Sequence, residues 1–65
     1  MSEDREIWKS AHEMIDRFGE DALTEIKSRI DELQAHGEEQ ASKVWLQILE
    51  AAKTLLKDRG TQSTH

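Results

Sequence analysis

Apolar residues recur at intervals of three and four along three stretches of the chain, which is the spacing of one face of an α-helix. Each stretch is followed by a glycine, at Gly19, Gly37 and Gly60. Glycine adopts a left-handed backbone conformation at little cost, and it therefore commonly occupies the position that ends a helix. The pattern predicts three helices over residues 3–18, 21–35 and 38–59, with Ser2 capping the first and Asp21 capping the second.

The apolar faces of these helices differ in width. The first two consist of Ile7, Trp8, Ala11, Met14, Ile15 and Phe18, and of Ala22, Leu23, Ile26, Ile30 and Leu33. The third consists of Ala41, Val44, Trp45, Ile48, Leu49, Ala51, Ala52, Leu55 and Leu56. On a helical wheel the third face spans roughly 160°, wider than the ~100° of an ordinary surface helix. The residues expected to be largely buried are Ile15, Ile26, Ile30, Trp45, Ile48 and Leu55.

The fold class that follows is all-α: a small three-helix bundle in one domain over residues 1–60, with a disordered polar tail at 61–65. At 65 residues the chain is shorter than the ~70–80 residues at which a single core comfortably stabilises a domain. The wide apolar face of the third helix leaves surface that two neighbours cannot cover. We therefore predict a homodimer through the third helix, with Trp45, Leu46, Leu49 and Leu56 as interface candidates.

Composition narrows the setting of the protein. The chain has no cysteine, which excludes disulfides and thiolate zinc sites, and it has no apolar run long enough for a signal peptide or a membrane span. We therefore expect a cytoplasmic protein without a membrane partner. The net charge is −5, and all of it lies in residues 1–36, which hold ten acidic and five basic residues. A solvated polar face explains this charge more simply than an acidic surface that imitates nucleic acid, although both readings stay open.

Few residues are candidates for catalysis or metal binding. The chain contains no cysteine nucleophile and no glycine-rich phosphate loop of a common pattern. His12 with Asp16, and Glu32 with His36, have the i,i+4 spacing that could place metal ligands on one helix face. This spacing is common by chance, and a histidine before Gly37 is explained by the helix dipole. We predict no catalytic residue, no cofactor and no metal, and therefore not an enzyme.

Nucleic-acid binding has a somewhat better basis, because three helices with short glycine turns are compatible with a helix-turn-helix. The outward side of the third helix would present Lys43, Gln47, Lys53, Thr54 and Lys57. Glu50 interrupts that side, and it contains no arginine for reading guanine, so nucleic acid is not the expected partner. Trp8 and Trp45 lie on the apolar faces, where a core or interface role is favoured over base stacking.

Several segments resemble a family of short bacterial all-helical proteins that is catalogued only as a domain of unknown function. The resemblance covers most of residues 11–56, and its most specific parts are the Val-Trp-Leu-x-Ile-Leu run at 44–49 and the Arg-x-Gly turn at 17–19. Where the family pattern has Gly-Asp before the last helix, this chain has Gly37-Glu38. The resemblance implies a compact helical fold and no particular activity, cofactor or substrate.

We predict a small non-enzymatic helical protein that acts by protein–protein contact, as an accessory or regulatory subunit. Its expected partner is a second copy or another protein. Two alternatives remain: an acidic inhibitor that occupies the nucleic-acid groove of a basic partner, and a small DNA-binding regulator.

Overall fold

The computed structural model describes the backbone of residues 2–61 and the side chains of residues 4–58. Its elements are α1 (Ser2–Phe18), a short 3₁₀ turn η1 (Gly19–Asp21), α2 (Ala22–Ala35) and α3 (Glu39–Thr61). Residues 2–61 contain no strand, which confirms the all-α class. Helical residues form two uninterrupted runs, 2–35 and 39–61, and the first of these runs bends at η1.

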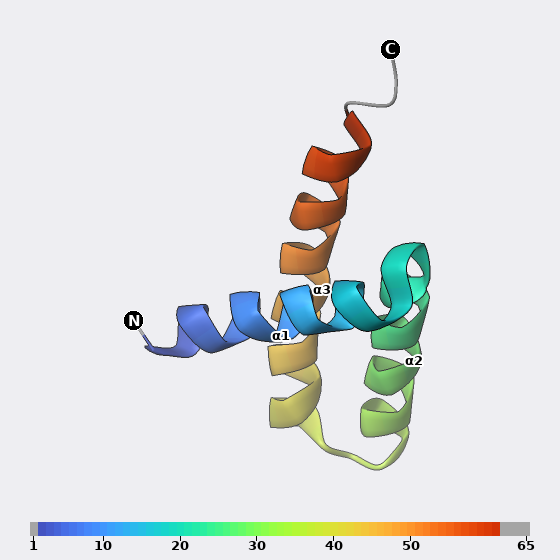
Figure 1. Ribbon diagram of the computed structural model, residues 1–65. Coiled ribbons are helices and arrows are strands. Elements are labelled where there is room, and N and C mark those ends of the chain that lie inside the picture. Colours follow the sequence, from blue (N-terminus) through green and yellow to red (C-terminus); the bar gives the residue numbers. More distant parts are fainter. Residues whose placement is uncertain (1, 62–65) are drawn as a thin grey trace.

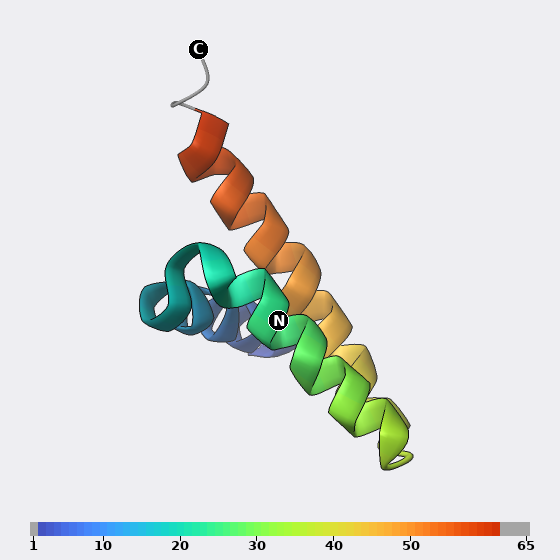
Figure 2. The ribbon, with the colours of Figure 1, turned by 90° about the vertical axis from the view of Figure 1, so that its right-hand side faces the viewer.

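Helix α3 is the central element of the fold. It packs closely against both α1 and α2, which contact each other much less. Figure 1 shows α2 and α3 side by side in opposite directions, with α1 crossing α3 near its middle. In Figure 2 both shorter helices lie on the same side of α3, and the last turns of α3 extend beyond them.

The two turns between helices depend on glycine, as the sequence predicts. Gly19 has a φ of +61° and Gly37 a φ of +75°, both in the left-handed region. At the end of α2 the Gly37 amide donates to the Gln34 carbonyl at 3.1 Å, and the Glu38 amide donates to the Leu33 carbonyl at 2.8 Å. These two bonds form a Schellman motif, which satisfies carbonyl groups that the end of a helix leaves without partners.

Three predictions about helix ends need correction. Asp21 precedes α2 but makes no side-chain capping hydrogen bond, because its backbone is already helical (φ −79°, ψ −3°) within η1. Ser2 is the first residue of α1 and not a residue before it. Gly60 does not end the third helix, since α3 continues to Thr61 and glycine can adopt the helical conformation as readily as the left-handed one. The predicted disordered tail is therefore wrong at Thr61, and its remainder, 62–65, lies outside the described residues.

The core lies where α1 and α2 meet α3. Its buried members are Ile7, Ala11, Ile15, Ala22, Ile26, Ile30, Ile48, Leu49, Ala51 and Ala52. Four of the six residues predicted to be largely buried are in this cluster, whereas Trp45 and Leu55 are only partly buried against it. Tryptophan is rarely buried completely because of its size, and Leu55 belongs to the second half of α3 (Glu39–Thr61), whose last turns extend beyond the shorter helices. Ser42 is buried as well, with its hydroxyl donating to the Glu39 carbonyl at 3.0 Å.

Candidate functional site

The structure separates the four predicted interface residues. Leu49 is 7% exposed and belongs to the core, while Trp45 and Leu56 are half-buried against it. The Arg29 guanidinium of α2 lies 5.4 Å from the centroid of the Trp45 ring, which is the distance of a cation–π contact. Leu46 is 43% exposed and points away from the core. Leu46 is therefore the most exposed of the four.

Leu46 belongs to a continuous exposed face of α3. We define the outward face as Glu39, Lys43, Leu46, Gln47, Glu50, Lys53 and Thr54. All of these residues are exposed, and their spacing of three and four places them on one side of the helix. Because α1 and α2 pack mainly on the opposite side, this face is open to solvent and is bordered by α1 on one flank and by the end of α2 on the other (Figure 2).

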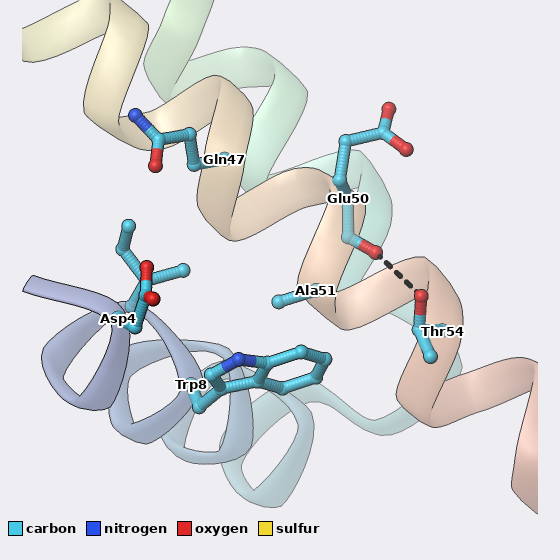
Figure 3. Close-up of a pocket in the computed structure, with 7 residues that line it drawn as sticks. Asp4, Trp8, Gln47, Glu50, Ala51 and Thr54 are labelled. Carbon is cyan, nitrogen blue, oxygen red and sulfur yellow. Dashed lines mark hydrogen bonds between the residues drawn. The ribbon is translucent and has the colours of Figure 1, made fainter. Parts of the chain in front are cut away.

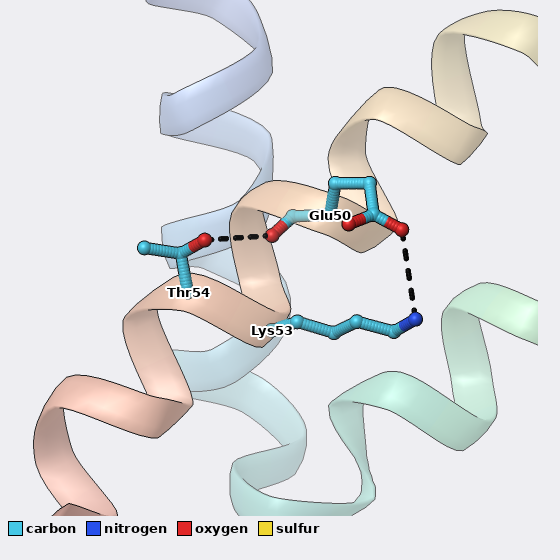
Figure 4. A network of polar contacts seen from close by, with 3 residues as sticks. All are labelled: Glu50, Lys53 and Thr54. Atoms are coloured by element: carbon cyan, nitrogen blue, oxygen red, sulfur yellow. Dashed lines mark hydrogen bonds and ion pairs between the residues drawn. The ribbon is translucent and has the colours of Figure 1, made fainter.

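Polar contacts on the outward face are local to α3. Figure 4 shows the Lys53 ammonium 3.5 Å from a Glu50 carboxylate oxygen, with the Thr54 hydroxyl donating to the Glu50 carbonyl at 3.1 Å. The side chains of Lys53 and Glu50 are 48% and 73% exposed. An ion pair this exposed contributes little to stability, because water and salt screen it. Both charged groups can therefore exchange this contact for one with another molecule at small cost.

A shallow hollow of about 250 Å³ lies between α1 and α3, next to the outward face. It is lined by Asp4, Ile7, Trp8, Gln47, Glu50, Ala51 and Thr54. In Figure 3 the Trp8 indole lies along one wall, beside Ala51 and Thr54. The indole is 42% exposed, so of the two roles predicted for it, core or interface, the core role is wrong and the interface role stays a prediction. Since Gln47, Glu50 and Thr54 belong to both surfaces, the hollow and the outward face are continuous.

Two further apolar residues of the predicted faces are also exposed. Val44 is 44% exposed on α3, and Phe18 is 38% exposed at the end of α1, directly before the Gly19 turn. The apolar pattern places both on the predicted faces, although not among the residues expected to be largely buried, and helical periodicity does not show where a packed neighbour ends. Position on the wide arc gave no signal, since Ala51 and Leu49 lie at its two edges and are buried.

The residues considered for metal binding do not come together. His12, Asp16, Glu32 and His36 are all exposed. Within the described part of the chain, no group of three or more His, Cys, Asp or Glu side chains could hold a metal ion. The acidic residues between positions 4 and 36 are likewise exposed, so the negative charge of α1 and α2 lies on the surface. None of the helices in the described residues is both long enough and apolar enough to cross a membrane.

Comparisons with known proteins identify no relative. No family model matches the chain, and searches of curated proteins and of solved structures also return no match. The resemblance to short helical proteins of unknown function therefore stays a prediction, and the function has to be argued from the surface itself.

Proposed function

We propose that this chain is a small non-enzymatic helical protein that acts by protein–protein contact, as an accessory or regulatory subunit. We further propose that it is a three-helix bundle that forms a homodimer through α3. The observation that carries the proposal is Leu46, which is 43% exposed on the outward face of α3. Trp8 is 42% exposed in the hollow that borders this face, so the two residues together give this side of the molecule apolar surface of the kind that interfaces cover.

The exposed apolar side chains support this proposal. Trp8, Phe18, Val44 and Leu46 are between 38% and 44% exposed, although each is a large apolar residue. A second copy would cover apolar surface that the short helices leave open, and such help is common for domains of this size.

The acidic surface supports a second candidate, an inhibitor that occupies the nucleic-acid groove of a basic protein. Its basis is the exposure of every acidic side chain described in residues 4–36. DNA binding has less support. The outward face does expose Lys43 and Lys53, but Glu39 and Glu50 alternate with them, and phosphate contacts require an uninterrupted positive surface.

Sedimentation equilibrium at micromolar concentration tests the homodimer. The expected result is a mass of about twice 7.5 kDa, with a melting temperature that rises with protein concentration. Leu46→Asp should shift the equilibrium to monomer, while Thr24→Asp, an exposed substitution on α2, should leave it unchanged. A monomeric parent protein would refute the homodimer.

An electrophoretic shift assay with random duplex DNA at low salt separates the remaining alternatives. A shift is expected only for a DNA-binding regulator, because phosphate contacts supply most non-specific affinity. The acidic inhibitor should give no shift by itself, yet it should release the duplex from a basic protein that it binds.

A further inference from the structure

We infer that the outward face of α3 is complementary to itself, so that two copies pair with their α3 helices antiparallel about a two-fold axis between Leu46 and Gln47. In this arrangement Lys43 faces the partner's Glu50, and Lys53 faces the partner's Glu39. The inference rests on the proposed homodimer and adds the identity, direction and register of its contact.

The order of charges along the outward face carries the inference. From its amino-terminal end the face presents Glu39, Lys43, Leu46 with Gln47, Glu50 and Lys53, that is, acid, base, centre, acid, base. An antiparallel two-fold pairing brings together residues at equal distances from the axis. Lys43 and Glu50 both lie between three and four residues from that axis, and Glu39 and Lys53 both lie between six and eight residues from it. Each base then faces an acid, and the symmetry repeats each contact.

Other arrangements of the same helices lack this match. A parallel pairing in register would place Lys43 against its own copy and Glu50 against its own copy, and like charges that face each other are destabilising. Shifting one helix of the antiparallel pair by about one turn would move the axis by half a turn, to about residue 48 or residue 45. Lys43 would then face the partner's Lys53, or Glu39 would face the partner's Glu50, so like charges would again meet. Antiparallel α3 helices also place the opposite ends of their helix dipoles together.

The positions of these side chains permit the pairing. Lys43 and Glu50 are seven residues apart, which is about two helical turns or ~10.5 Å, so both project on the same side of α3. Glu50 is 73% exposed, and its contact with Lys53 is long at 3.5 Å, so it can turn to a cation on the partner (Figure 4). Leu46 lies at the axis, where two copies of its exposed side chain would cover each other.

The hollow beside Trp8 extends the same contact. Antiparallel pairing places the partner's Glu39 and Gln40 next to Lys53 and Thr54, and Thr54 lines the hollow together with the Trp8 indole. The first turn of the partner's α3 would therefore shield an indole that is 42% exposed in the single chain. In this dimer α1 contributes to the interface together with α3.

Charge reversal tests the pairing. Lys43→Glu and Glu50→Lys each replace two attractive contacts with two repulsive ones, and each should raise the dimer dissociation constant by roughly ten- to thirty-fold. The double variant K43E/E50K should return to within about three-fold of the parent. An equimolar mixture of the two single variants should form heterodimers in preference to either homodimer, because both cross-contacts are then attractive.

Matched controls separate this pairing from an effect of total charge. Lys27→Glu on α2 and Glu13→Lys on α1 change the net charge by the same amounts at exposed positions away from α3, and they should alter the dissociation constant by less than about three-fold. Circular dichroism checks that every variant keeps its helix content. The antiparallel register is wrong if the parent dimerises but the two α3 variants have the same dissociation constants as their controls, or do not form heterodimers preferentially. In that case the homodimer itself is still supported. A monomeric parent would overturn both the homodimer and the register.

Discussion

Truncation of Ile48 to alanine tests the packing of α3 most directly. Ile48 is 3% exposed within the core formed by all three helices. The change removes three carbons, and their lost transfer free energy is about 2.4 kcal/mol at ~0.8 kcal/mol each. If half of the roughly 75 Å³ they fill stays empty, the cavity adds about 0.9 kcal/mol. Alanine recovers roughly 0.4 kcal/mol through its higher helix propensity, so we expect a net loss of about 3 kcal/mol.

That loss is large for this chain. At ~0.05–0.15 kcal/mol per residue, a domain of 65 residues has a free energy of unfolding of roughly 3–10 kcal/mol. Ile48→Ala could therefore unfold the protein outright at the lower limit. Ile48→Val, with an expected cost of about 1 kcal/mol, keeps the comparison measurable in that case.

Val44 provides the matched control, since it is also β-branched and lies one turn before Ile48 on the same helix, but it is 44% exposed. Val44→Ala removes two half-exposed carbons and gains a similar helix propensity, so its net cost should stay below about 0.5 kcal/mol. Urea denaturation followed by circular dichroism, at one fixed protein concentration, measures both variants. Equal losses at Ile48 and Val44 would refute the orientation of α3.

Three further changes have defined outcomes. Gly19→Ala and Gly37→Ala should each destabilise the protein by about 1 kcal/mol in the same urea assay. An added Cβ meets nothing within 4 Å at either position, so the cost comes from the positive φ and not from a clash. Asparagine in place of alanine should restore part of the lost stability, because it tolerates positive φ better. Ala52→Leu should lower the melting temperature by the equivalent of about 1–3 kcal/mol, because Ala52 is 0% exposed and three added carbons overpack a closely packed core. No change in melting temperature would reveal a loosely packed core. Arg29→Ala should lower the free energy of unfolding by about 0.5–1 kcal/mol through loss of its contact with the Trp45 ring. In a double-mutant cycle, the same substitution should have little effect in a Trp45→Leu background, where the ring is already absent.

The local features of the fold could be predicted from the sequence because they depend on neighbours along the chain. The intervals of three and four predict the helices, and the preference of glycine for positive φ predicts the turns at Gly19 and Gly37. The same reasoning fails at Gly60, where glycine permits both conformations and nothing in the local sequence decides between them. It also fails for the Asp21 cap, because the 3₁₀ turn before α2 holds Asp21 in a helical conformation.

Tertiary structure decided which parts of each apolar face are covered. Periodicity assigns Val44 and Ile48 to the same arc, yet Val44 is exposed and Ile48 is buried. The same holds for the predicted interface, where Leu49 lies in the core and Leu46 faces solvent. The angle of a residue on the helical wheel follows from its number alone, but its burial also depends on where α1 crosses α3 and how far α2 runs beside it. Those positions result from packing among residues far apart in the sequence, and they leave the charged outward face of α3 open to a partner.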